Sequence, residues 1–342
     1  MKTTIKTVAE YVGVSRGTVD RVLHNRGNVD SDVSRKVTQA LADLNYKPNA
    51  IARALVTNRK TTKLGFILPN ESGFFHDEIH RAIKNTREEF CDIGIEIDVA
   101  ECDAMCPEEY VTQIERMCEE DLCGLVICSQ NSDLLIQKIN ELDVAGIPVI
   151  TVNSDIPDSR RKCFIGEDAI RCGRVAAEII CKHLKENEKI LVVAGIPEFA
   201  GHQDRIRGFL EYLEEKGIPQ DMYQIIYTYE KYDLTYDKII HALREQPHIK
   251  NIYLGIESTK AYKKVLSELQ LAQLPFVVSH DTADHTLQAL KEGTFDFTID
   301  QDMYDQGNRP LRMLIDFCLY EKPLIKTDEK IALHIVSSEC ID

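Results

Sequence analysis

Residues 3–62 read TTIKTVAEYVGVSRGTVDRVLHNRGNVDSDVSRKVTQALADLNYKPNAIARALVTNRKTT, and their pattern indicates the fold of the N-terminal part of the chain. Apolar residues recur there at helical spacing in three segments, 5–12, 16–23 and 32–45. Gly13 is placed to end the first helix, and Ser15 and Ser31 are placed to cap the second and third. A short turn containing glycine between two amphipathic helices is the helix-turn-helix pattern. The stretch therefore predicts a small all-α helix-turn-helix head.

The same stretch is basic, whereas the rest of the chain is acidic. Residues 1–62 hold eleven lysines and arginines and five acidic residues, which gives a net charge of +6. The whole chain carries −15, so the remaining residues carry −21. A basic head on an acidic body is typical of a nucleic-acid-binding module joined to a part that does not bind nucleic acid.

The second helix of the head is the candidate DNA reader. In a helix-turn-helix this helix enters the major groove with its early residues on base edges. Arginine reads guanine through two hydrogen bonds, worth roughly 1–3 kcal/mol of discrimination. We therefore expect base contacts from Arg16 and Arg21, and phosphate contacts from Thr4, Ser15 and Thr18. From the pattern alone, the alternative is a solvated face of a helical hairpin.

The head also resembles a known family. The helix-turn-helix TIKTVAEYVGVSRGTVDRVL, the Tyr-x-Pro-Asn break at 46–49 and the segment AIARAL after it resemble the head of the lactose-repressor (LacI/GalR) family of transcription regulators over about sixty residues. The resemblance implies a DNA-binding domain at 1–48 and a hinge helix and linker at 49–62. It places Arg16, Gly17 and Arg21 near bases. It further implies operator contacts from Asn49, Ala52 and Leu55, with Leu55 wedged into the minor groove.

The hinge role agrees with the chemistry of its residues. The segment 50–55 is small and helix-prone, but it is too short to be stable alone, so pairing on DNA would have to stabilise it. An ordinary linker is the alternative, and it suits 57–62 better. Asp20 and His24 replace residues that are commonly Ser and Asn in the family, and Gly17 has no side chain to read a base. These departures predict an unusual operator sequence.

From Leu64 onward, short apolar strands alternate with amphipathic helices. We expect strands at 64–68, 95–100, 124–128, 147–152, 162–166, 189–194, 223–229, 251–255, 276–279, 295–300 and 332–337, and helices near 75–92, 108–120, 132–143, 168–186, 203–216, 233–245, 258–269 and 302–320. Helices between short apolar strands indicate parallel sheets. Two series of four or five strands predict an α/β region of two doubly wound parallel-sheet lobes.

This region resembles the type I periplasmic sugar-binding fold, in its ribose-binding branch, which the same family uses as an effector domain. The resemblance implies a two-lobed ligand-binding and dimerisation domain at 63–342, with the chain crossing between lobes near 160, 282 and 322. The lobes would then be about 63–160 plus 283–322, and 161–282 plus 323–342.

Polar and aromatic residues follow the ends of the predicted strands, where open α/β sheets bind ligands. The candidate ligand-binding residues are Asn70, Phe74, Phe75, Gln130, Asn153, Arg205, Glu257, Asp281 and Gln301. Planar polar side chains can bond paired hydroxyls, and aromatic rings can cover the apolar face of a sugar. The resemblance implies sugar contacts from Phe74, Phe75, Arg205, Asp281 and Gln301. Each residue taken singly could instead be a solvated loop residue or an N-cap.

Other classes of protein fit less well. The eleven cysteines include no CxxC pair, so we expect free thiols rather than disulfides or a zinc site. No apolar run reaches about 18 residues and no secretory signal is visible, so we expect a cytoplasmic protein without membrane contact. Neither a nucleophile motif nor a phosphate loop or HExxH signature is present, so we expect no enzyme, no catalytic residues, no metal and no cofactor.

Together these patterns predict a ligand-responsive, DNA-binding transcription repressor of a carbohydrate-uptake or catabolism operon. It would bind a near-palindromic operator as a homodimer, with a sugar, polyol or derivative as effector between the lobes. The tail IALHIVSSECID has no leucine heptad, which favours a dimer over a coiled-coil tetramer. The alternative is a solute-binding protein without a DNA role.

Overall fold

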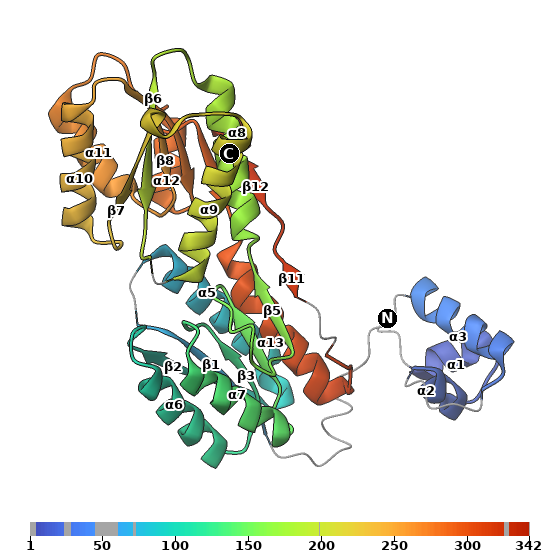
Figure 1. Ribbon diagram of the computed structural model, residues 1–342. Coiled ribbons are helices and arrows are strands. Elements are labelled where there is room, and N and C mark those ends of the chain that lie inside the picture. Colours follow the sequence, from blue (N-terminus) through green and yellow to red (C-terminus); the bar gives the residue numbers. More distant parts are fainter. Residues whose placement is uncertain are drawn as a thin grey trace. The chain divides into compact units, whose positions relative to one another are not determined.

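The computed structural model describes residues 5–23, 29–44, 61–70, 73–197, 199–324 and 328–341. The chain divides into two compact units (Figure 1), one made of residues 1–60 with 92–94 and the other of 61–91 with 95–342. Thr4 and the predicted hinge residues Asn49, Ala52 and Leu55 lie outside the described residues.

The first unit contains the three predicted helices. They are α1 (Ile5–Val12), α2 (Arg16–Leu23) and α3 (Ser31–Asp43). Their buried residues are Val8, Ala9, Val19, Val37 and Ala40, with six partly buried apolar residues packed around them. The prediction of a small all-α head is confirmed.

The helix ends follow local chemistry. Gly13 has a φ of 75° and donates its N–H to the carbonyl of Ala9, which ends α1. Ser15 Oγ accepts from the Thr18 N–H at 3.1 Å and caps α2 as expected. The cap of α3 was assigned wrongly: Asp30 Oδ1, not Ser31, accepts from the backbone N–H groups of the first turn. A carboxylate one residue earlier reaches those donors, and Ser31 is already helical.

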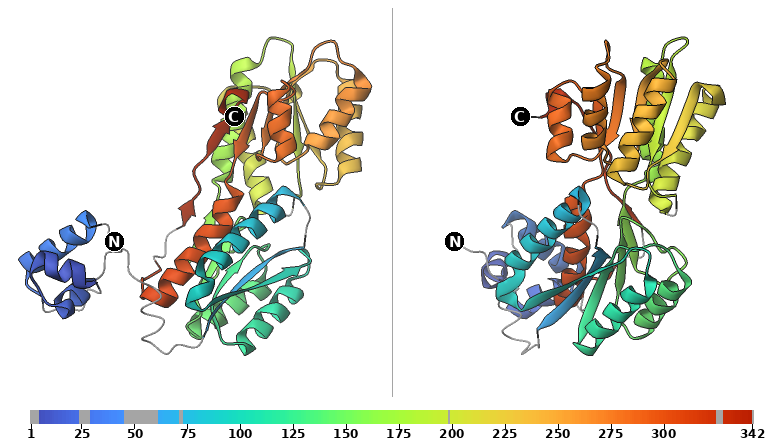
Figure 2. Two further views of the ribbon diagram at one scale, coloured as in Figure 1. Left: turned by 180° about the vertical axis from the view of Figure 1, so that it is seen from behind. Right: turned by 90° about the vertical axis from the view of Figure 1, so that its left-hand side faces the viewer.

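The second unit has two sheets with helices on both faces (Figures 1 and 2). The strands of the first sheet are β1 (Thr62–Pro69), β2 (Ile95–Cys102), β3 (Leu122–Ile127), β4 (Val149–Val152), β5 (Cys163–Gly166) and β11 (Glu329–Lys330). They pair in parallel in the order β11-β5-β4-β3-β1-β2. The helices of this lobe are α5 (Phe74–Phe90), α6 (Pro107–Glu119), α7 (Asp133–Val144) and α13 (Met303–Tyr320), with a short 3₁₀ turn at Cys91–Ile93.

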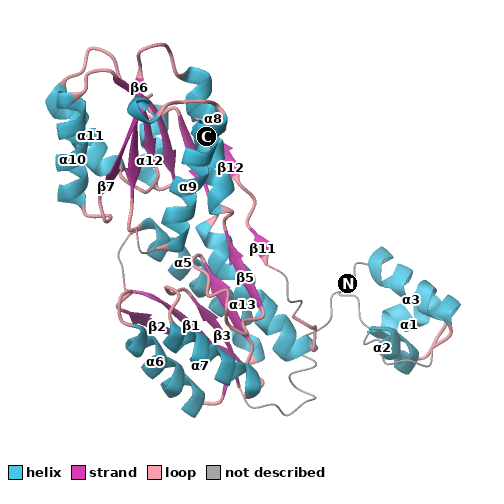
Figure 3. Ribbon diagram, in the orientation of Figure 1, coloured by secondary structure: helices cyan, strands magenta, loops and turns pink. Residues whose placement is uncertain are grey.

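The second sheet repeats this order. Figure 3 shows strands of both sheets in magenta, with helices in cyan beside them. Its strands are β6 (Lys189–Ala194), β7 (Tyr223–Tyr227), β8 (Ile249–Leu254), β9 (Phe276–His280), β10 (Phe297–Asp300) and β12 (His334–Val336). The order is β12-β10-β9-β8-β6-β7, and only β12 runs antiparallel. The helices are α8 (Ala169–His183), α9 (Ala200–Glu215), α10 (Tyr232–Glu245), α11 (Thr259–Leu269) and α12 (Asp284–Lys291), with 3₁₀ turns at Gln220–Met222 and Ser338–Cys340.

Strand β6 shows why both faces of a sheet are covered. Leu191 and Val193 point into a core formed with α10, α11 and α12, whereas Ile190 and Val192 point into a core formed with α8 and α9. Successive side chains of a strand lie on opposite faces, so a continuous apolar run requires helices on both. The prediction of two doubly wound parallel-sheet lobes is confirmed.

The predicted lobe boundaries near 160, 282 and 322 are wrong. Strand β5 pairs with β4 in the first sheet, because the short β4–β5 connection keeps it beside its predecessor. Strand β10 pairs with β9 in the second sheet, because the unpredicted helix α12 and Phe295 pack into that lobe's core. Strand β11 pairs with β5, whereas β12 pairs with β10.

The chain therefore changes lobes at 167–168, 301–302 and 331–333. We define lobe 1 as the described residues of 61–91, 95–166 and 303–330, and lobe 2 as those of 169–300 and 334–341. The connections themselves belong to neither sheet.

Helices α8 and α9 pack closely because each has a glycine at the crossing. A Cβ on Gly173 would lie 1.9 Å from the carbonyl oxygen of Arg205, and a Cβ on Gly208 would lie 2.0 Å from that of Ile170. No side chain fits at either position, so the backbones approach directly. This contact sets the position of Arg205 on α9.

All eleven cysteines are free, as expected, but only Cys102, Cys128, Cys163 and Cys172 are buried. Burial raises the pKa of the Cys102 and Cys163 thiols to about 11, so both stay protonated at neutral pH. Within the described part of the chain, no helix is both long and apolar enough to span a bilayer.

Candidate effector cleft and DNA-reading face

The carboxyl ends of strands from both sheets line one cavity of about 220 Å³. Pro69, Cys128 and Asn153 follow or end strands of lobe 1, and Ile256, Asp281 and Gln301 follow strands of lobe 2. In chain order, the five consecutive strands of each sheet are arranged 2-1-3-4-5, so the chain continues to opposite sides of the sheet after the first and third strands, β1 and β3 or β6 and β8. Ligands of open α/β sheets bind beyond the carboxyl ends of the strands at such a point. The rest of the lining is Gly73, Phe74, Phe75, His76, Ser154, Glu167, Phe199, Gly201, His202, Arg205, Glu230, Glu257 and Met303.

Asn153 and Asp281 occupy equivalent places in the two lobes. Asn153 follows β4 with a φ of 61°, and Asp281 follows β9 with a φ of 68°. Each donates its backbone N–H to the neighbouring strand, to the carbonyls of Ile165 on β5 and Ile299 on β10 respectively. Left-handed backbone is uncommon outside glycine, although Asn and Asp tolerate it, and here it presents a polar side chain from each lobe to the cavity.

A buried ion pair forms the polar centre of the lobe 2 side. Arg205 donates to Glu167 and to the carbonyl of Gly255, and the two charged side chains are 5% and 7% exposed. Burial alone would lower the pKa of Arg205, but the Glu167 carboxylate raises it above its usual value, so the guanidinium stays charged. Arg205 Nε and Glu167 Oε2 are buried without a hydrogen-bond partner, so a donor and an acceptor remain for a ligand.

Asp281 lies beside this pair. Its Oδ1 accepts from Gln301 Nε2 at 2.7 Å. Burial raises the pKa of the Asp281 carboxyl to about 6, against the lowering effects of Arg205 and of the Gln301 hydrogen bond. Asp281 is thus mostly ionised at neutral pH and can accept hydrogen bonds from hydroxyl groups.

Tyr253, His280 and His202 are uncharged polar rings of lobe 2. Tyr253 OH and His280 Nε2 hydrogen-bond at 2.7 Å, and Tyr253 stacks on Phe209 at 4.7 Å. Burial lowers the pKa of His280 well below its usual value, and lowers that of His202 to about 3. His202 is therefore neutral, and its 3.6 Å contact with Glu230 is not an ion pair at neutral pH.

Seven of the nine predicted ligand-binding residues line the cavity: Phe74, Phe75, Asn153, Arg205, Glu257, Asp281 and Gln301. Asn70 and Gln130 are not part of the lining. Asn70 is exposed and hydrogen-bonds through its backbone to Cys102, whereas Gln130 contacts Met105 Sδ. Glu257 Oε1 accepts from the Thr259 N–H and lies 2.9 Å from His285 Nε2, so it is largely satisfied within the protein.

Glu167 was missed from the sequence. It directly follows β5, which was predicted as a strand at 162–166, so the strand-end pattern that marked Asn153 could have found it; it also begins the first connection between lobes. Gln301 lies in the second connection, so two polar residues of the lining belong to the segments that join the lobes.

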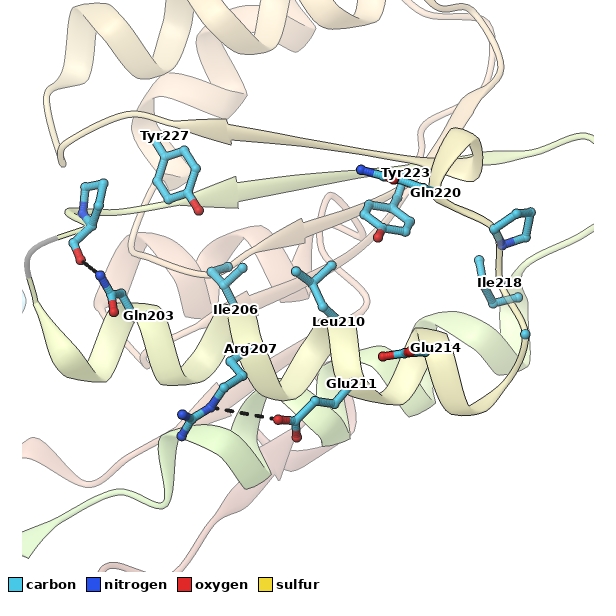
Figure 4. A pocket seen from close by; sticks show the side chains of 13 residues that line it. Gln203, Ile206, Arg207, Leu210, Glu211, Glu214, Ile218, Gln220, Tyr223 and Tyr227 are labelled. Carbon is cyan, nitrogen blue, oxygen red and sulfur yellow. Dashed lines mark hydrogen bonds and ion pairs between the residues drawn. The ribbon is translucent and has the colours of Figure 1, made fainter.

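A larger hollow of about 800 Å³ lies between α9 and β7 (Figure 4). Two of its polar side chains have partners within the protein: Arg207 lies near Glu211, and Gln203 donates to the carbonyl of Pro197 (Figure 4). Arg207 also pairs with Asp204 outside the lining. None of the unsatisfied buried atoms found in the described residues belongs to its lining. The cavity between the lobes is the better candidate despite its smaller volume.

On the first unit, Ser15, Arg16, Gly17 and Arg21 are exposed and Thr18 is half-buried. Ser15 Oγ and Thr18 Oγ1 also lie within 2.8 Å of each other, so the cap occupies both hydroxyls in part. A Cβ on Gly17 would meet only Ser15 Oγ, at 3.7 Å. Packing does not require this glycine. Its lack of a side chain leaves no protruding group at this position on the face of α2 that would approach a DNA groove.

Two family models match the chain. Residues 4–49 match "Bacterial regulatory proteins, lacI family", and residues 64–322 match "Periplasmic binding protein domain".

Curated relatives are transcription regulators. The regulator DegA of Bacillus subtilis is 28% identical over 231 residues, covering 67% of this chain and 66% of that protein. RegA of Clostridium saccharobutylicum is 27% identical over 330 residues, covering 92% of each. The ribose operon repressor of Halalkalibacterium halodurans is 24% identical over 329 residues, covering 94% of this chain and 92% of the repressor.

Solved structures share the fold of the second unit. An ABC-transporter solute-binding protein from Burkholderia graminis, in complex with D-arabinose, has a TM-score of 0.73 and 20% identity over 82% of this chain and 96% of that one. A putative LacI transcriptional regulator from Bacteroides fragilis has a TM-score of 0.70 and 19% identity over 82% of this chain and 98% of that one.

Proposed function

Because the chain belongs to the LacI family of bacterial regulatory proteins and joins that family's head to a periplasmic-binding-protein domain, we propose that it is an effector-controlled transcription repressor of a carbohydrate operon. It acts in the cytoplasm on DNA, not as an enzyme. The carrying observation is the combination of an exposed Arg16 and Arg21 on a reading helix with a polar cavity that has unsatisfied buried atoms.

The chemistry of the cavity favours a small neutral effector rich in hydroxyls. Arg205 Nε can donate, and Glu167 Oε2 and Asp281 can accept. The volume lies below the roughly 300–1,000 Å³ of sites for drug-sized ligands, which favours a molecule as small as a monosaccharide or polyol. Phe74 and Phe75 supply aromatic surface from the first turn of α5.

The charge of the lining disfavours a phosphorylated sugar. Four carboxylates face the cavity, from Glu167, Glu230, Glu257 and Asp281, whereas Arg205 is the single arginine or lysine of the lining. A dianionic phosphate would lie among like charges at a cost of several kcal/mol.

Control of DNA binding follows from the residues in the connections. An effector that contacts Glu167 and Gln301 contacts two of the segments whose backbone must adjust when the lobes move. In a homodimer on a near-palindromic operator, that movement changes the spacing of the two heads. Such coupling between sites is typically worth about 1–3 kcal/mol.

A thermal-shift screen of pentoses, hexoses and polyols tests the cavity. A true effector at 100 times its Kd should stabilise the protein by about 2.7 kcal/mol. Asp281→Asn should abolish the shift, whereas Asn70→Ala, at a predicted residue outside the lining, should retain it. If no compound of the set shifts the melt, or if Asp281→Asn shifts as the wild type does, the effector proposal is wrong.

A further inference from the structure

His76, His80 and Glu101 form a cluster of ligand atoms at the edge of lobe 1. His76 and His80 are four residues apart on α5, so they lie on the same face of the helix, and Glu101 lies near the end of β2. Glu101 Oε1 is 3.2 Å from His76 Nε2 and 3.0 Å from His80 Nε2. The two imidazole rings lie 4.1 Å apart, and the three ligand atoms lie within 4.8 Å of one another.

The two distances to Glu101 are close to the edges of a tetrahedral metal site. Zinc binds histidine nitrogen and carboxylate oxygen at about 2.0–2.2 Å, which places neighbouring ligands of a tetrahedron roughly 3.3–3.5 Å apart. Both Glu101 edges fall within about 0.5 Å of that separation without any rearrangement of the backbone.

Hydrogen bonding alone accounts poorly for the cluster. His76 Nε2 hydrogen-bonds Glu101 Oε1, whereas the buried His80 Nε2, directed at the same oxygen, makes no hydrogen bond of acceptable geometry despite its 3.0 Å approach. The other ring nitrogen of His76 lies 3.8 Å from Asp77 Oδ1.

We propose that His76, His80 and Glu101 bind a divalent transition-metal ion of the zinc class. Two imidazoles and one carboxylate suit zinc, cobalt or nickel better than magnesium or calcium, which take mainly oxygen ligands. The side chains are 24%, 35% and 40% exposed, so an ion can enter from solvent.

Three protein ligands leave a coordination position open. Because His76 also lines the effector cavity, an ion here would lie at its rim and would tie the first turns of α5, which carry Phe74 and Phe75, to β2. The site goes beyond the effector proposal and does not rest on it.

No metal was expected from the sequence. Glu101 lies 25 residues from His76 and is brought to it by the packing of β2 beside α5, so no short ligand spacing contains all three residues.

Titration of the chelator-treated full-length protein with Co²⁺ tests the proposal. We expect one equivalent bound with the visible spectrum of nitrogen and oxygen ligands and without the charge-transfer band of thiolate coordination, which separates this site from the eleven cysteines. His80→Gln and His76→Gln should each weaken binding at least about tenfold. His241→Gln, at an exposed histidine of α10, is the matched control and should bind as the wild type does.

Zn²⁺ should also raise the Tm of the wild type and of His241→Gln, but not that of His80→Gln, whose melt without metal shows whether it folds. If His80→Gln does not fold, Glu101→Gln takes its place in both measurements. No bound Co²⁺, binding through thiolates alone, or equal affinity in the ligand variants would overturn the proposal. Operator binding by the same variants keeps this outcome separate from that of the repressor proposal.

Discussion

Replacing Arg205 with glutamine should destabilise the second unit by about 3–5 kcal/mol, the usual cost of removing one partner of a buried ion pair. Arg205 and Glu167 are nearly inaccessible, at 5% and 7% exposure, and Asp281 lies close enough for its pKa to respond to Arg205. Without the guanidinium, both carboxylates are left in a low-dielectric site, where they must take up protons or draw in water. The carbonyl of Gly255 also loses a donor.

Equilibrium unfolding in urea, followed by far-UV circular dichroism without effector, measures this loss. Arg174→Gln is a matched control, since Arg174 on α8 pairs with Glu215 on α9 at 2.7 Å and so joins the same two helices. That pair is 33% and 57% exposed, so solvent replaces the lost interaction and the midpoint should not move measurably.

A double variant separates the loss of the pair from the loss of packing. The double variant Glu167→Gln/Arg205→Gln should lose less unfolding free energy than the two single variants lose in sum, because neither partner of the ion pair then remains buried without its counter-charge. If Arg205→Gln unfolds at the same urea concentration as Arg174→Gln, the pair does not stabilise the unit and the reasoning fails.

Three further outcomes are expected. Arg21→Ala should lower operator affinity by roughly 1–3 kcal/mol at its base pair, and wild-type affinity should fall steeply with salt in fluorescence anisotropy; a flat salt response would show that the head does not bind DNA through phosphates. The pKa of Asp281, raised from 3.8 to about 6, means that the folded state holds this proton more tightly, so stability should fall by up to about 3 kcal/mol as pH rises from 4 to 6. Asp281→Asn should lack this loss of stability between pH 4 and 6. A pH profile of stability identical to that of the wild type would contradict the assignment to Asp281. Gly173→Ala should lower the free energy of unfolding by about 1–3 kcal/mol, because its Cβ pushes α8 away from α9 and displaces Arg205. Gly201→Ala, whose Cβ meets nothing within 4 Å, should melt at or above the wild-type temperature. Equal losses of stability in the two variants would contradict the close approach of the helices at Gly173.

Several features of this protein could be predicted because they depend on neighbours in the chain. The bounds of α1 and α2 were predicted to the residue, since a glycine, a capping serine and apolar spacing all lie within a few residues of each helix. The strand and helix order of the second unit, apart from α12 and β11, follows from alternation that each segment carries by itself.

The membership of each strand in a sheet could not be obtained in that way. Strands β5 and β10 were placed in the wrong lobes, although both were recognised as strands. Their apolar residues would fit either sheet, and only the backbone pairing with β4 and β9 decides between them. That pairing is made between segments about ten to twenty residues apart, and no local pattern encodes it.

The candidate site divides in the same manner. Asn70 and Gln130 follow strands as Asn153 does, but a position after a strand does not determine where the side chain points, and the left-handed backbone of Asn153 is visible only in the fold. Glu167 and the His76–His80–Glu101 cluster become recognisable once distant segments lie side by side.

The sequence by itself determined the elements, the head and the class of regulator, because these depend on local periodicity and short motifs. The tertiary structure alone decided which polar groups meet, because buried hydrogen bonds and charges are satisfied by residues from separate segments.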